Sequence, residues 1–168
     1  YVFLNIMGLA VGIACFVLIG MFVIHEISYD KFHEQKDRIY RLVLDGKVGE
    51  QELKVANTSP PMGEALVAEI PEIINSVRMD SWNESPIKID DKVFIEDHFT
   101  LADSTFFDIF SFPLIYGDPA TALNRLRTIV LTGSAAQKYF GMDNPVGESL
   151  KVGTDSVFWE ITGVCEDA

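Results

Sequence analysis

Residues 26–42 read EISYDKFHEQKDRIYRL and follow directly on an apolar segment, so the chain changes character at Glu26. Residues 1–24 contain no Asp, Glu, Lys, Arg or His. A helix rises about 1.5 Å per residue, so this segment would be roughly 36 Å long, more than the ~30 Å hydrocarbon core of a bilayer. The sequence therefore predicts a membrane-spanning helix over residues 1–25 and a water-exposed domain over residues 26–168.

Two other interpretations of the apolar segment can be weighed. A cleaved signal peptide has a basic start and an apolar stretch of about 7–15 residues, and this segment has neither feature. A buried core helix stays open as the alternative. The chain begins at Tyr1 and stops at Ala168 without a closing element, so we expect a fragment of a longer protein.

The apolar segment carries two glycines four residues apart, Gly8 and Gly12, in the stretch GLAVG. Residues at this spacing share one helix face, and the lack of side chains would let a second membrane helix approach closely. The alternative is that glycine is simply common in membrane helices. We predict that Gly8 and Gly12 form a helix-packing site.

The charged stretch after Glu26 contains no Pro or Gly as far as Arg41, so the helix is expected to continue for at least one further turn. Asp30 could cap a restarted helix. Residues 39–44 then alternate as in a strand, and Asp45-Gly46 is typical of a hairpin turn.

The rest of the chain mixes short helices and strands irregularly, which predicts an α+β fold. Helices are expected over residues 62–70, over 103–110 with Asp103 or Ser104 as cap, and over 134–140 between Thr132 or Ser134 and Gly141. Strands are expected in residues 73–79, 127–133 and 156–167, and residues 144–152 are expected to form a turn and then a strand. A hairpin is expected over 85–97 with its turn at Asp90-Asp91, and a Gly-Asp-Pro turn at 117–119.

The composition argues against several functions. All charged side chains lie after residue 24, and their net charge of −12 would repel nucleic acid and anionic lipid. His25, His33 and His98 lack metal-ligand spacing, and no phosphate-binding glycine loop is present. Ser134 follows a glycine but lacks the second glycine of a nucleophile elbow. We therefore predict no catalytic, cofactor-binding or metal-binding residue and no cofactor.

Several motifs together carry a family resemblance. The first part, NIMGLAVG followed by EISYDKFH and DRIYRL, resembles the start of the FtsX-like, MacB-type ABC transporter permeases, especially the paralogues of Bacteroidetes. The later stretches ADSTFFDIFSFPLIYGDPATAL, TIVLTGSAAQKYFG, NPVGESL and ITGVCED resemble the periplasmic core domain of that family in the same order. One departure is Leu126, where related sequences often have proline.

The resemblance implies a non-catalytic permease subunit in the inner membrane, with residues 26–168 in the periplasm and porter-like βαβ units in the domain. Its expected partners are a cytoplasmic ABC ATPase, a second permease of the same or another kind, membrane lipid and, in a tripartite assembly, a periplasmic adaptor and an outer-membrane channel. ATP-driven closure would move the periplasmic domain for export or another envelope process. Tyr29 and Phe32 would lie at the membrane interface, where aromatic side chains are enriched.

Two other protein classes share parts of this pattern. The extracytoplasmic sensor domain of a receptor such as a histidine kinase also places an acidic α/β domain after one membrane helix. A membrane-anchored envelope enzyme would need a nucleophile with a base, and the sequence offers no such pair. Because fold does not fix cargo, the resemblance names no substrate.

Overall fold

The structure is a computed structural model that describes residues 1–28, 32–153 and 157–167. The chain divides into two compact units, Tyr1–Asp37 and Arg38–Ala168, and each is described by itself. The predicted division at residues 25 and 26 stays a prediction.

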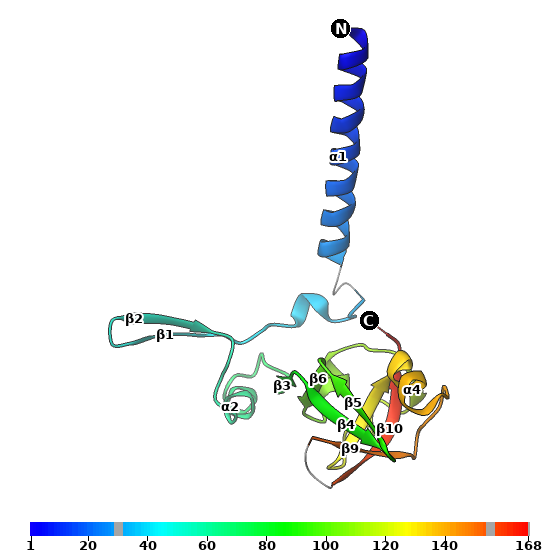
Figure 1. The fold of residues 1–168 in the computed structure, drawn as a ribbon. Helices are drawn as coiled ribbons and strands as arrows, with labels where there is room; N and C mark the ends of the chain where they lie inside the picture. Colours follow the sequence, from blue (N-terminus) through cyan, green and yellow to red (C-terminus); the bar gives the residue numbers. More distant parts are fainter. Residues whose placement is uncertain (29–31, 154–156, 168) are drawn as a thin grey trace. The chain divides into compact units, whose positions relative to one another are not determined.

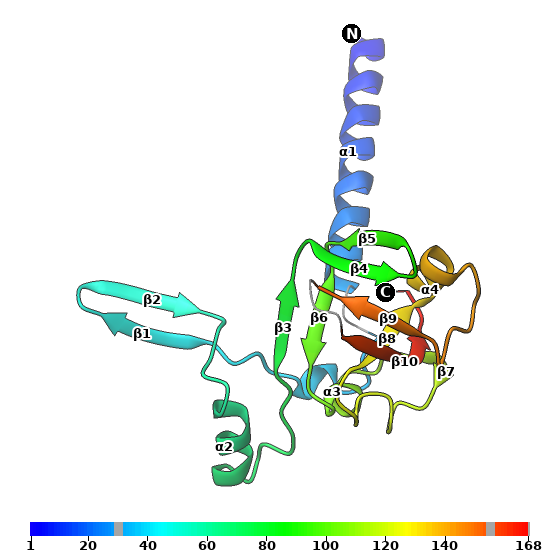
Figure 2. The same ribbon diagram turned by 60° about the horizontal axis from the view of Figure 1, so that its bottom comes forward.

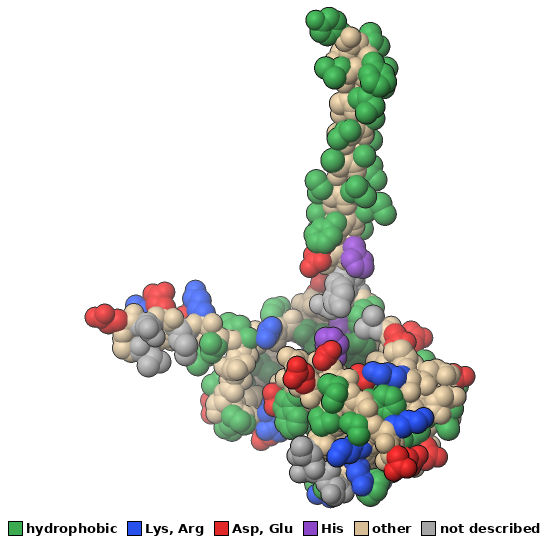
Figure 3. Space-filling view, viewed as in Figure 1, with side chains coloured by type: hydrophobic (Ala, Val, Ile, Leu, Met, Phe, Trp, Pro, Cys, Tyr) green, Lys and Arg blue, Asp and Glu red, His purple; other side chains and the backbone are tan. Residues whose placement is uncertain are grey.

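The first unit consists mainly of the helix α1 (Val2–Ser28), shown in Figure 1. It is long and apolar enough to cross a membrane, and none of its most apolar stretch is buried. Figure 3 shows hydrophobic side chains along the visible face of this helix. The predicted helix over residues 1–24 is confirmed and extends to Ser28, and the rest of the turn expected after Glu26 lies outside the described residues.

The predicted helix does not continue through the charged stretch. Between Phe32 and Val43 the structure has one 3₁₀ turn, η1 (Lys36–Arg38), and residues 39–43 are not in a strand. Both expectations were wrong for these residues. Helices shorter than about 12–15 residues are marginal in water unless they bury an apolar face, and the side chains of η1 are exposed. The proposed cap Asp30 lies outside the described residues.

In its described residues, the second unit contains two short helices, one single-turn helix and ten strands. In chain order they are β1 (Leu44–Val48), β2 (Gln51–Val55), α2 (Met62–Glu69), β3 (Met79–Trp82), β4 (Ser85–Ile89), β5 (Lys92–Glu96), β6 (Phe99–Ala102), α3 (Phe106–Ile109), β7 (Leu114–Gly117), β8 (Thr128–Thr132), α4 (Gly133–Phe140), β9 (Ser149–Val152) and β10 (Phe158–Cys165). The α+β class predicted from the sequence is confirmed.

Strands β1 and β2 form a separate hairpin, visible in Figures 1 and 2. The turn lies at Gly49, which has a φ of +66°, and the turn predicted at Asp45-Gly46 was wrong. Both of those residues lie within β1. Cross-strand ion pairs accompany the observed register: Lys54 Nζ lies 3.4 Å from Asp45, and Lys47 Nζ lies 3.6 Å from Glu52.

The main sheet has six strands in the order β5-β4-β9-β10-β7, with β8 also paired to β10 (Figure 2). Strand β10 is antiparallel to β9 at its start and to β7 at its end. Strand β8 lies on the other edge of β10 and runs parallel to it, with α4 between them in the chain. These elements form a βαβ unit of the predicted kind, in which β9 is inserted. The two remaining strands, β3 and β6, pair as a ribbon.

The core lies on the face of the sheet that α4 covers. Ile87, Leu150 and Ile161 come from three neighbouring strands and are almost fully buried. Tyr139 on α4 packs into the same cluster. Burying large aliphatic side chains contributes about 1.5–3 kcal/mol each, so this cluster is a main source of stability.

The helix α4 and the β4–β5 hairpin confirm local predictions. The hydroxyl of Thr132 accepts a hydrogen bond from the N–H of Ala135 at 3.3 Å, and Gly141 ends the helix in the left-handed conformation. The turn of the hairpin lies at Asp90-Asp91, and Asp90 has a φ of +50°.

Two further local predictions in the second unit were wrong. The strand expected over residues 73–79 is displaced, since β3 begins only at Met79. The short helix α3 lacks the side-chain cap expected from Asp103 or Ser104, and Thr105 precedes its first residue without a capping bond. The carboxylate of Asp103 instead binds Arg78, a partner distant in the sequence.

Candidate functional site

The predicted packing residues lie one turn apart on α1. A Cβ atom added to Gly8 or to Gly12 would meet no atom within 4 Å, apart from the neighbouring backbone of the helix itself. This face of α1 is therefore open in the structure. A close helix–helix contact at these glycines stays a prediction.

Of the two residues predicted to lie at the membrane interface, the structure describes only Phe32. Tyr29 lies outside the described residues. Phe32 is 48% exposed, and the centroid of its ring lies 4.0 Å from that of His33. His33 is buried, whereas the ring of Phe32 retains exposed surface. An interfacial role for Tyr29 and Phe32 stays a prediction.

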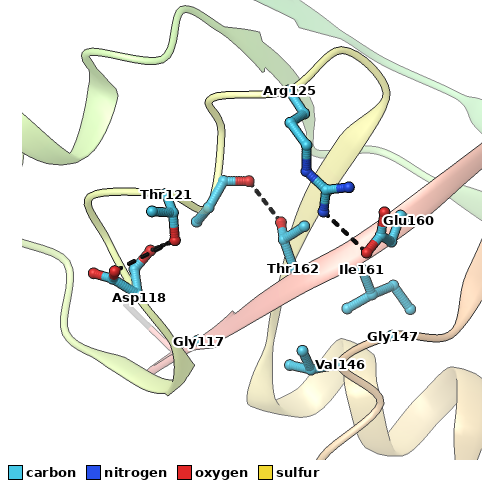
Figure 4. Close-up of a pocket in the computed structure, with 10 residues that line it drawn as sticks. Gly117, Asp118, Thr121, Arg125, Val146, Gly147, Glu160, Ile161 and Thr162 are labelled. Carbon is cyan, nitrogen blue, oxygen red and sulfur yellow. Dashed lines mark hydrogen bonds and ion pairs between the residues drawn. The ribbon is translucent and has the colours of Figure 1, made fainter.

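The second unit has a hollow of about 310 Å³ between the β7–β8 loop, the turn before β9 and strand β10 (Figure 4). Its lining consists of Gly117, Asp118, Thr121, Ala122, Arg125, Val146, Gly147, Glu160, Ile161 and Thr162. The sequence predicted only a Gly-Asp-Pro turn here. Three stretches far apart in the chain form the hollow, so no local motif could indicate it.

The polar groups of this hollow already have partners within the fold. Arg125 donates to Glu160 at 3.0 Å, and the Thr162 hydroxyl donates to the carbonyl of Ala122 at 2.7 Å (Figure 4). The Asp118 carboxylate accepts from the N–H of Ala120 at 3.0 Å. These bonds fix the β7–β8 loop onto β10, and we assign the hollow a structural role.

Two glycines allow β7 and β10 to approach closely beside the hollow. Gly117 and Gly163 are direct partners in the β7–β10 ladder. A Cβ atom on Gly117 would overlap the carbonyl oxygen of Thr162, and one on Gly163 would lie 2.8 Å from Leu114. Gly117 also has a φ of +95°, which L-residues rarely adopt.

A bidentate ion pair joins the residue before β3 to the residue after β6, and a side chain of α2 lies beside it. The Arg78 guanidinium donates two bonds to Asp103, at 2.8 and 2.9 Å, and a third at 3.4 Å to the carbonyl of Pro60. Glu64 on α2 lies 3.6 Å from the same guanidinium. The hydrogen bond from Arg78 lowers the pKa of the Asp103 carboxyl. No residue of α2 is fully buried, and Glu64 links this helix to the Arg78–Asp103 pair.

A second polar cluster holds α4 against β5. Burial opposes ionisation of Glu96, but hydrogen bonds from Lys138 and Tyr139 outweigh it and lower the pKa of the Glu96 carboxyl. Burial and the neighbouring carboxylate raise the pKa of the Tyr139 hydroxyl. The Tyr139 ring also packs against Phe94, with centroids 5.0 Å apart.

Metal-binding clusters were not expected from the sequence. Within the described ranges, no group of three or more His, Cys, Asp or Glu side chains could hold a metal ion. The polar clusters of the second unit consist of ion pairs and hydrogen bonds between elements. Such an arrangement positions strands and helices.

Comparisons with known proteins agree with this picture. The model of the MacB-like periplasmic core domain family matches residues 2–168. The chain is similar to the crystal structure of a domain of a protein described as a permease from Porphyromonas gingivalis, with 27% identity, a TM-score of 0.60, and coverage of 70% of this chain and 49% of that one. No curated protein matches the chain.

The chain is also similar to the periplasmic region of MacB from Actinobacillus actinomycetemcomitans, with 20% identity, a TM-score of 0.51, and coverage of 66% of this chain and 51% of that one. At that identity the likeness concerns the fold. This chain spans about half the length of each of the two structures. Since the family model matches nearly the whole sequence, the chain belongs to the MacB-like periplasmic core domain family of ABC transporter permeases.

Proposed function

We propose that this chain is the first membrane helix and part of the periplasmic domain of a permease in the inner membrane, and that the domain transmits ATP-driven movement for export or another envelope process. The observation that carries the proposal is the match of one family model to both α1 and the folded unit. The helix would occupy residues 1–25, and residues 26–168 would lie in the periplasm.

The proposed partners follow from this architecture. A cytoplasmic ABC ATPase would supply the energy, because the chain has no phosphate-binding loop. A second permease would complete the membrane unit, and a periplasmic adaptor with an outer-membrane channel would join it in a tripartite assembly. The open glycine face of α1 supports close packing against another membrane helix at Gly8 and Gly12. Tyr29 and Phe32 would lie at the membrane surface.

The test uses the full permease that contains this chain. We expect an affinity-tagged permease to recover an ABC ATPase from solubilised membranes. A spin label at Asp91→Cys, on the β4–β5 turn, would then report movement between two copies in the presence of ATP and vanadate. An ATPase variant that cannot hydrolyse ATP is the control, because it cannot complete the cycle of ATP hydrolysis. Recovery of the permease without any ABC ATPase would contradict the proposal.

A reporter fused after Arg78 tests the orientation separately. We expect alkaline phosphatase to be active at this position, because that enzyme needs the oxidising periplasm to form its disulfides. A fluorescent protein that folds only in the cytoplasm is the matched reporter and should stay dark. The reverse pattern would contradict a periplasmic domain.

A further inference from the structure

We draw no further inference here: the strongest candidate, the apolar face of the β1–β2 hairpin on which Leu44 and Val55 are direct partners, carries no proposal, because the chain spans about half the length of the related structures and nothing in the described residues shows what covers this face.

Discussion

Replacing Gly117 by alanine should destabilise the second unit strongly. The residue has a φ of +95°, and holding a non-glycine residue in such a conformation costs about 1–3 kcal/mol. The new Cβ atom would also overlap the carbonyl oxygen of Thr162 and lie 2.9 Å from the Cα atom of Gly163. Both are backbone atoms of β10, so relief requires the two strands to separate. Overpacking of this kind adds about 1–3 kcal/mol, which gives a total of about 2–6 kcal/mol.

Gly147 provides a matched control. Its φ is +94°, nearly that of Gly117, but a Cβ atom there would meet nothing within 4 Å. Gly147→Ala should therefore cost only the backbone strain, about 1–3 kcal/mol. The difference between the two variants measures the close approach of β7 and β10.

Urea unfolding of the chain in detergent micelles measures both values. Both tryptophans of the sequence, Trp82 and Trp159, lie in the second unit, so their fluorescence reports its unfolding and not that of α1. The free energy of unfolding follows from the midpoint and slope of each curve. Equal losses for Gly117→Ala and Gly147→Ala would refute the argument from close approach.

Three further predictions concern single side chains, and urea unfolding measures each. Asp103→Asn should remove stability at neutral pH and progressively less as the pH falls below about 4. The pKa of Asp103 is lowered, so its contribution is present above its unfolded pKa of about 4 and is lost as the pH falls through its folded pKa. An unchanged pH profile would contradict this. Leu150→Ala should cost about 2–5 kcal/mol because Leu150 is fully buried; Leu126→Ala, at a residue 96% exposed, should change stability by less than about 0.5 kcal/mol. Thr132→Ala should cost about 0.5–2 kcal/mol through loss of the α4 cap, and Thr132→Ser should restore most of it.

The elements that the sequence predicted well depend on nearby residues alone. The helix α1 follows from a charge-free segment of membrane-spanning length. The limits of α4 follow from a hydroxyl side chain at Thr132 and a glycine at Gly141, each acting on the adjacent turn of helix. The turn at Asp90-Asp91 likewise lies between two runs of strand-forming residues.

The elements that the sequence predicted wrongly depend on distant partners. Asp45-Gly46 has the composition of a turn, but the pairing with β2 places both residues within a strand. Asp103 has the position of a helix cap, but Arg78, 25 residues earlier, binds its carboxylate. A local sequence pattern indicates which structures a residue can adopt. Contacts with other parts of the fold then determine which of these structures forms.

The same distinction applies to the candidate sites. Gly8, Gly12 and Phe32 could be proposed from residue type and spacing, and their roles stay predictions. The hollow beside β10 combines stretches that the sequence does not relate. The position of β5 in the sheet depends on strand order as well. A hairpin with its turn at Asp90-Asp91 was predictable, but which of its strands would lie at the edge was not.

A domain that transmits movement must resist deformation, and the arrangement around β10 favours this. The strand pairs with β7, β8 and β9, so separating any one of these three strands breaks hydrogen bonds to the same central strand. Beyond its end, the Asp167 carboxylate accepts a hydrogen bond from the Ser134 hydroxyl at 2.6 Å and two longer ones from the Ser134 N–H, which ties the chain to the start of α4. These bonds also lower the pKa of Asp167. Load applied to this end of β10 would therefore reach α4 and the sheet together, as the proposed transmission of movement requires.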